Sequence, residues 1–164
     1  MTDHILHLAA ILVLLGVANG APIVARKIFG NRFNTPLDNG ARFFDGRPLL
    51  GPAKTVRGLV VSITATTLAA VLLGMEWVLG AGLAGAALAG DALSSFLKRR
   101  LGLKPHSQAL ALDQIPESLL PLWLLRAPLQ LDAVDIAVLV AVFVALELLL
   151  SRLLYKLHIR DRPY

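Results

Sequence analysis

The sequence predicts an all-α integral membrane protein, a single domain built as a bundle of five transmembrane helices. Of the 164 residues, 56% are hydrophobic and only 16% are charged, and the mean hydropathy is +0.68. A typical soluble domain has roughly 45–50% apolar and about 25% charged residues. The apolar residues are gathered into runs close to the ~20 residues that cross a bilayer as a helix, which disfavours a soluble fold.

Four of these runs contain few or no charges and are each predicted to span the membrane: Ile5–Ala25, Gly58–Met75, Val78–Leu97 and Ile136–Tyr155. The first run is longer than the ~7–15 apolar residues of a signal peptide and no Lys or Arg precedes it, so it is expected to be a permanent span. A fifth span is predicted at Ile115–Leu131, although this run contains three prolines and two charged residues.

The positions of the basic residues predict the orientation of the spans. Seven lie between the first and second spans, four between the third and fourth, four near the C-terminus, and one, Arg126, inside the fourth. With five spans, the first three groups fall on one side, and the positive-inside rule puts the N-terminus outside and the C-terminus, with loops 26–57 and 98–114, in the cytoplasm. These basic residues do not indicate a nucleic-acid partner, because they are expected to face lipid headgroups or nucleotide phosphates.

Length and composition exclude several kinds of function. Five spans take up about 100 residues, which leaves no segment able to bury the core of a separate soluble catalytic domain. The chain has no cysteine, which excludes disulfides, thiolate metal sites and a cysteine nucleophile. Any chemistry is therefore expected at the membrane, on the two long cytoplasmic loops and the span ends beside them.

The third predicted span combines a small-residue face with a polar stripe. Small residues recur every four positions, which predicts close packing of another helix: Gly82, Ala86 and Gly90. Asp91 begins a stripe on one helix face that continues through Ser94, Ser95 and Lys98 to the cytoplasmic surface. A charge inside a span costs about 2.5–3.5 kcal/mol on insertion scales, so Asp91 is expected to face a cavity or a partner. A pairing with a serine or a basic residue, without a ligand, stays open.

Further acidic residues are expected in the cytoplasmic half of the bundle, with Asp113 at the surface and Glu117 and Glu147 deeper. Carboxylates at one depth repel each other unless a cation lies between them. Mg²⁺ is the natural cation, because it takes hard oxygen ligands and is usually held by one or two carboxylates together with substrate phosphates. A simple hydrogen bond is the alternative role for Glu147.

The start of the second span is a candidate anion site. Thr55 is a predicted N-cap, and Lys54 and Arg57 flank it in the first turn. Cations are unfavourable beside the positive end of a helix unless an anion is bound there. The alternative is that both are orientation charges that touch lipid phosphate. The segment is not a Walker P-loop, because no glycine directly precedes the lysine.

These elements together resemble the CDP-archaeol synthase family of small membrane enzymes with five transmembrane helices, which are related to phosphatidate cytidylyltransferases. The resemblance runs from about residue 19 to residue 115 and rests on the following order of motifs: Pro36-Leu-Asp38-Asn39-Gly40, Asp45-Gly46-Arg47, Gly51, Lys54-Thr55, Arg57-Gly58, Gly90-Asp91, Ser95-Phe-Leu-Lys98-Arg99-Arg100 and Asp113-Gln114. The family commonly continues Asp-Gln-Leu-Asp, whereas this chain has Pro116-Glu117 in that place.

The resemblance implies an Mg²⁺-dependent enzyme that transfers CMP from CTP to a membrane lipid phosphate and releases pyrophosphate. In archaeal members the lipid is an unsaturated dialkylglycerol phosphate; a phosphatidate-like lipid is the other candidate. The family resemblance implies catalytic roles for Asp91, Lys98 and Asp113. It also implies metal binding by Asp91, Asp113 and Glu117. The residues implied to bind substrate are Asp38, Asn39, Lys54, Thr55, Arg57, Ser95 and Arg99.

The sequence leaves two alternatives to this enzyme: a non-catalytic protein that binds anionic lipid or nucleotide, and a small transporter subunit. A transporter needs a polar path across the whole membrane, whereas the predicted polar track stops about midway. The expected location is the cell membrane, as a multi-pass protein with its active site facing the cytoplasm. A homodimer is a further alternative that the sequence does not decide.

Overall fold

The computed structural model contains five α-helices, α1 to α5, and describes residues 2–103 and 112–156. Their bounds are Thr2–Phe29, Val56–Leu72, Trp77–Arg100, Gln114–Leu124 and Ala133–Lys156. The described part has no strand, only two isolated bridges within the loop that joins α1 to α2. The middle of the predicted 98–114 loop and the last basic residues of the sequence lie outside the described residues.

Within the residues that the structure describes, three helices are long and apolar enough to cross a membrane: Thr2–Phe29, Trp77–Arg100 and the Ala133–Ser151 part of α5. The 17 residues of α2 form a shorter apolar helix. Large apolar side chains of these helices are exposed on the outside of the bundle, among them Leu68, Leu72, Val138 and Leu149. This surface suits lipid and agrees with an integral membrane protein.

The fourth helix is the main correction to the predicted spans. It ends at Leu124 instead of Leu131, and its 11 residues rise only about 16 Å. Pro128 has no N–H to bond the carbonyl of Leu124, so a regular helix cannot continue through this residue to Leu131. The chain instead forms a turn in which Gln130 takes a positive φ of 53° and the Leu131 N–H bonds the Arg126 carbonyl at 2.8 Å. This pattern is a Schellman-type helix ending.

The short helix α4 lies antiparallel along the first half of α3. A Cβ on Gly90 would lie 2.1 Å from the Pro116 carbonyl oxygen, and one on Gly82 would lie 3.6 Å from the Leu125 side chain. Pro116 therefore packs about 15 Å along α3 from the last residue of α3, because ten residues separate Gly90 from Arg100. The helix α4 starts inside the bundle, deeper than the surface position predicted for it.

One polar contact explains how α1 continues through Pro22. A proline at this position leaves the Ala18 carbonyl without its usual helical donor. The buried hydroxyl of Ser62, on α2, donates to that carbonyl at 2.6 Å. The helix therefore extends to Phe29, beyond the predicted end at Ala25, and α1 and α2 are joined where the backbone has lost a bond.

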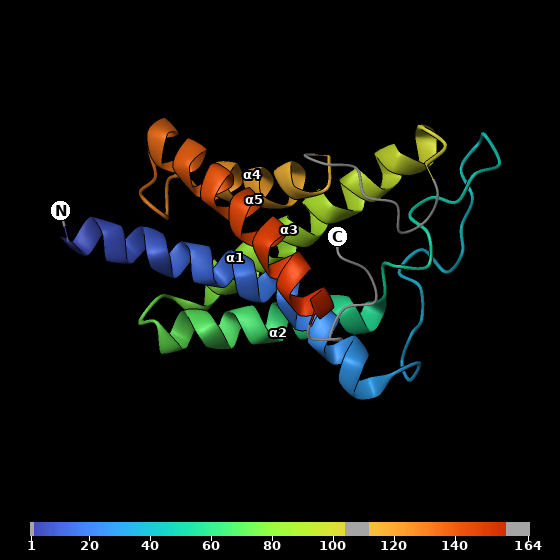
Figure 1. Cartoon of the computed structure of the whole chain (residues 1–164), viewed down its shortest axis with the longest axis horizontal. Helices are drawn as coiled ribbons and strands as arrows, with labels where there is room; N and C mark the ends of the chain where they lie inside the picture. Colours follow the sequence, from blue (N-terminus) through green and yellow to red (C-terminus); the bar gives the residue numbers. More distant parts are fainter. Residues whose placement is uncertain (1, 104–111, 157–164) are drawn as a thin grey trace.

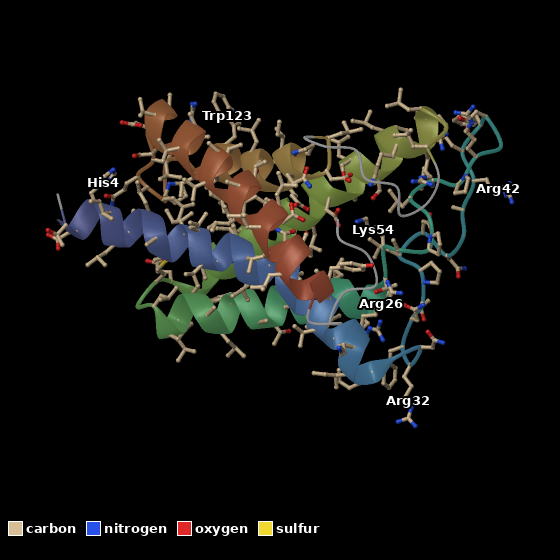
Figure 2. The ribbon with its side chains drawn as sticks, in the orientation of Figure 1. His4, Arg26, Arg32, Arg42, Lys54 and Trp123 are labelled. Atoms are coloured by element: carbon tan, nitrogen blue, oxygen red, sulfur yellow. The ribbon has the colours of Figure 1, made fainter. Side chains whose placement is uncertain are left out.

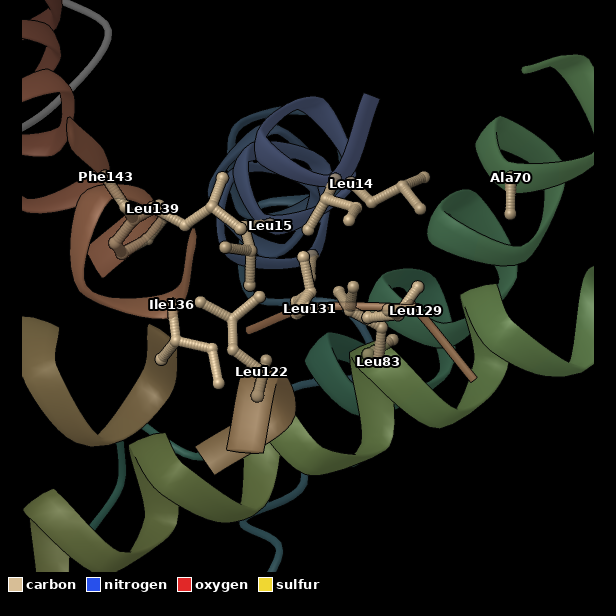
Figure 3. Packing of buried hydrophobic residues seen from close by; sticks show 14 residues of the cluster. Leu14, Leu15, Ala70, Leu83, Leu122, Leu129, Leu131, Ile136, Leu139 and Phe143 are labelled. Atoms are coloured by element: carbon tan, nitrogen blue, oxygen red, sulfur yellow. The ribbon is translucent and has the colours of Figure 1, made fainter. Parts of the chain in front are cut away.

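The apolar core fills one end of the bundle. Leu14, Leu83, Leu122 and Ile136 come from four different helices and are buried together (Figure 3). The N-terminus lies at this end, and the long loop before α2 lies at the other (Figure 1). Buried polar and charged residues gather towards the loop end instead, among them Arg57, Ser94, Arg99, Gln114 and Glu117.

Reciprocal arginine contacts attach the loop to the end of α3. Arg47 donates to the last carbonyls of α3, at 2.5 Å from the Arg100 oxygen and 3.3 Å from that of Arg99. Arg100 in turn donates to Asp45 at 2.5 Å and to the Pro48 carbonyl at 2.6 Å. Cations bonded to the carbonyl end of a helix also suit its dipole. The two basic connections are thus held together at one end of the bundle, as the predicted topology requires.

Candidate functional site

A cavity of about 240 Å³ lies between the end of α1, the start of α2 and the middle of α3. Four of the residues predicted from the sequence line it: Lys54, Thr55, Arg57 and Asp91. Figure 2 shows Lys54 and Arg26, another lining residue, near the loop end of the bundle, whereas His4 and Trp123 lie towards the other end. The cavity therefore lies on the side of the molecule that carries the basic loops.

The chain around Lys54 is held by backbone bonds on both sides. The Leu37 N–H donates to the Lys54 carbonyl at 2.7 Å, and the Val56 N–H donates to the Thr35 carbonyl at 3.0 Å. Thr55 has extended dihedral angles, and its hydroxyl oxygen accepts the Gly58 N–H at 3.1 Å. The predicted N-cap is thereby confirmed, and it places Lys54 directly before the first turn of α2.

Two ion pairs connect α3 to its neighbours. The Lys54 ammonium group pairs with the Asp91 carboxylate, and Lys98 pairs with Asp113 at 2.6 Å. Asp91 and Lys98 are two turns apart on α3, about 10 Å along its axis. Asp91 thus has the basic partner that the sequence left open, and it also faces the cavity. These pairs place cations and carboxylates alternately between the cavity and the start of α4.

The two predicted arginines have different surroundings. Arg57 is buried and donates to the carbonyls of Gly30 and Arg32, at 2.9 Å and 2.6 Å. It therefore fixes the turn after α1 while it lines the cavity. Arg99 is buried near the end of α3 and interacts electrostatically with Asp113, but it does not line this cavity. Ser95 is buried on the same helix.

Glu117, which comes one residue after the position of the family's second acid, lies close to the Lys54–Asp91 ion pair. Glu117 is buried and has electrostatic interactions with Asp91 and Lys54. Its carboxyl group is also hydrogen-bonded to that of Glu147, on α5. Gly90 allows this arrangement, because a side chain there would collide with the backbone of Pro116 and Glu117. The chain therefore brings Glu117 near Asp91 although the sequence has proline where the family has its second acid.

The donor chemistry fits a divalent cation held mainly by substrate. Within the described residues, no group of three or more His, Cys, Asp or Glu side chains is arranged to hold a metal ion. Asp91 nevertheless offers hard oxygen atoms to the cavity and already holds the ammonium group of Lys54. Mg²⁺ is commonly bound by one or two carboxylates with waters and phosphate oxygens. The predicted three-ligand set of Asp91, Asp113 and Glu117 stays a prediction.

Asp38 and Asn39 shape the loop and do not line the cavity. The Asp38 carboxylate accepts N–H bonds from Gly40 at 3.0 Å, Leu50 at 2.9 Å and Gly51 at 3.2 Å. Asn39 sits in the turn with a positive φ of 48°, which asparagine tolerates better than most residues. Burial alone would raise the pKa of Asp38, but these backbone hydrogen bonds outweigh it and lower the pKa below its usual value.

We expect Asp38→Ala to loosen the loop in a pH-dependent way. Because the folded state lowers the pKa of Asp38, the ionised carboxylate stabilises the loop above the unfolded pKa of about 3.9, and this contribution is lost as the pH falls through the lower folded value. The variant should therefore unfold at a lower temperature than wild type at pH 7, with a difference that narrows below about pH 4. Thermal unfolding curves in detergent across this pH range measure the difference in unfolding temperature.

The control is Glu76→Ala, which removes an exposed carboxylate at the other end of the bundle. A deficit independent of pH would contradict the role of the charge.

The sequence analysis missed part of the cavity wall. Arg26, Asn31 and Asn34 line it beside Lys54 and Asp91. Their polarity was visible in the sequence, but no spacing rule connects the end of one helix to the start of the next across a loop. The only available signal was that the two asparagines lie six and nine residues after the first predicted span, in the loop that leads to Lys54.

Comparisons with known proteins agree with this geometry. A family model described as CDP-archaeol synthase, CarS-like, matches residues 3–79 and 73–164. A CDP-archaeol synthase of Sulfurisphaera tokodaii is 35% identical over 155 residues, which cover 90% of this chain and 89% of that protein. The corresponding protein of Sulfolobus acidocaldarius is 33% identical and covers 90% of this chain and 91% of its own length.

A further relative and a solved structure support the same assignment. A CDP-archaeol synthase of Hyperthermus butylicus is 39% identical over 104 residues, or 60% of this chain and 59% of that protein. A solved structure, described as an intramembrane enzyme for archaeal membrane lipids biosynthesis, aligns with a TM-score of 0.72 at 29% identity, over 85% of this chain and 91% of that one. This chain is therefore similar to these proteins in sequence, and to the solved structure in fold as well.

Proposed function

Since the chain belongs to the CDP-archaeol synthase family and is a CTP-dependent cytidylyltransferase of lipid biosynthesis, we propose that its lipid substrate is an archaeol-type dialkylglycerol phosphate and that the reaction requires Mg²⁺. In this reaction an oxygen of the lipid phosphate attacks the α-phosphorus of CTP. The new P–O bond joins CMP to the lipid phosphate, and the bond between the α-phosphorus and the bridging oxygen breaks to release pyrophosphate. The products are a CDP-lipid and pyrophosphate.

The observation that carries the proposal is the Lys54–Asp91 ion pair in a cavity at the start of α2. Nucleotidyl transfer needs alignment of the phosphates and neutralisation of their charge more than covalent help from the protein. Asp91 is the carboxylate that would hold the metal, with Asp113 and Glu117 as further candidates. When bound, Mg²⁺ would neutralise phosphate charge and orient the oxygens. Lys54 would then bind phosphate, since its ammonium group is already held at this wall.

The other predicted residues have supporting roles in this proposal. Lys98 and Arg99 supply positive charge beside the start of α4, and Arg57 holds the turn at the cavity while its charge faces the same space. Thr55 fixes the first turn of α2, whose free N–H groups favour an anion. Ser95, Asp38 and Asn39 support the helix face and the loop. All of these residues belong to the half of the molecule that carries the basic connections.

We also propose that the cavity opens on the cytoplasmic side, with the N-terminus outside. The gathering of the basic connections at one end of the bundle supports this orientation. The five-span topology requires α4 and the turn that follows it to return the chain together to the outer face, because α4 alone is too short. The closely packed apolar core at that face gives little support to a transporter, which needs a polar path through it.

A panel of lipid phosphates tests the proposed reaction. Purified protein with labelled CTP and Mg²⁺ is expected to form a CDP-lipid with an unsaturated dialkylglycerol phosphate, and faster than with a diacyl phosphatidate. Chelation of Mg²⁺ should abolish the product, and added Mg²⁺ should restore it. Thin-layer chromatography of the labelled lipid measures both results. If well-folded protein forms no product with any lipid of the panel, the catalytic proposal is wrong and the non-catalytic binding protein takes its place.

A further inference from the structure

The turn that follows α1 forms one wall of the cavity and is held in an unusual conformation. Gly30 and Phe33 both have positive φ, of 54° and 56°. A bulky residue such as Phe33 rarely adopts this conformation, which is strained for side chains larger than glycine. The two hydrogen bonds from Arg57 to the carbonyls of Gly30 and Arg32 hold the turn in place. The structure thus maintains a costly turn beside the predicted nucleotide site.

This turn presents two carboxamide side chains to the cavity. Asn31 and Asn34 line it, and neither side chain makes a hydrogen bond within the described part of the chain. The other main polar groups of the wall already have partners there, because Lys54 pairs with Asp91, Arg57 binds backbone carbonyls and Thr55 caps α2. The two asparagines therefore have donors and acceptors available for a ligand.

We propose that Asn31 and Asn34 bind the pyrimidine base of the nucleotide, an inference that rests on the proposed function. If the phosphates of CTP lie at Lys54 and Asp91, the base of the same molecule must meet another part of the cavity wall. The edge of cytosine carries an amino donor beside two acceptors, N3 and O2. A carboxamide has the matching pair, an NH₂ donor and a carbonyl acceptor. The apolar side chains of Leu37 and Leu59 line the same space and suit the faces of the base.

The test compares the affinity of the protein for CTP, which carries a base, with its affinity for tripolyphosphate, which carries none. The Asn31→Ala/Asn34→Ala double variant is titrated with CTP and with tripolyphosphate, which carries only the phosphate chain, by isothermal titration calorimetry in detergent. Loss of hydrogen bonds to the base is expected to raise the Kd for CTP by about 10-fold or more, and to leave the Kd for tripolyphosphate within about twofold. Arg32→Ala is the matched control, because it changes the same turn at a side chain outside the cavity and should bind both ligands as wild type does.

Equal affinities of the double variant and wild type for CTP would overturn the inference, as would an equal loss for both ligands. If the double variant does not fold, Asn34→Leu keeps about the size of the side chain, removes its donor and acceptor without adding a charge, and should weaken CTP binding selectively. Neither titration contains lipid or requires turnover. A wild-type protein that makes no CDP-lipid would therefore count against the proposed function, while the two titrations still decide the role of the asparagines.

Discussion

Asp91→Asn is expected to lower the rate of CDP-lipid formation by at least about 10²-fold with little loss of folding. The substitution keeps the size of the side chain and removes the charge that pairs with Lys54 at the cavity wall. An amide is a poor ligand for Mg²⁺ in comparison with a carboxylate, and it does not balance the positive charge around the phosphates. The measurement is the initial rate with labelled CTP and saturating lipid phosphate, beside a thermal unfolding curve of each protein.

The matched control for this variant is Glu76→Gln, at the N-cap position of the same helix. Glu76 precedes α3 at the other end of the bundle, is exposed and makes no capping bond with its side chain. Both substitutions remove one carboxylate, so they change the net charge of the protein equally. Glu76→Gln should keep the wild-type rate. If Asp91→Asn also kept that rate, Asp91 would have only its structural pairing with Lys54, and the proposed metal site would be wrong.

The sequence predicted much of the fold because the bilayer imposes simple rules on it. Apolar runs of about 20 residues identify long helices, and the helices at the two ends of the chain and the third one agree with that expectation. The fourth helix did not follow hydropathy. A regular helix cannot continue through Pro128, and the absence of a side chain at Gly90 allows α4 to pack close against α3. Both are local backbone effects, and the average hydropathy of a segment does not predict them.

The candidate site was predictable where one helix carries the pattern. The spacing of Asp91 and Lys98 on α3 and the capping role of Thr55 follow from helical periodicity and from the start signals of a helix. The partners of these residues, Lys54 and Asp113, come from other segments, and their contacts depend on how the helices pack. The same is true of Asn31 and Asn34, whose place in the cavity depends on a turn held by Arg57.

Gly90→Ala is expected to be the most damaging of the small substitutions, although it adds only one methyl group. A Cβ at this position would lie 2.1 Å from the Pro116 carbonyl oxygen and 2.9 Å from the Glu117 Cα, and both are backbone atoms that cannot rotate away. Helix α4 must therefore move off α3, which costs typically 1–3 kcal/mol in a packed interior and displaces Glu117 from Asp91. We expect a lower unfolding temperature and a loss of activity of about 10-fold or more.

Gly85→Ala separates this packing effect from the general effect of alanine in a helix. Gly85 lies on the same helix, and a Cβ there would meet no atom within 4 Å. Because alanine favours a helix by roughly 0.5–1 kcal/mol over glycine, Gly85→Ala should be as stable as wild type or more so, with full activity. If Gly90→Ala behaved in the same way, α4 would not be packed against α3 at this depth. Glu117 would then not approach Asp91, and it would have no place in the site.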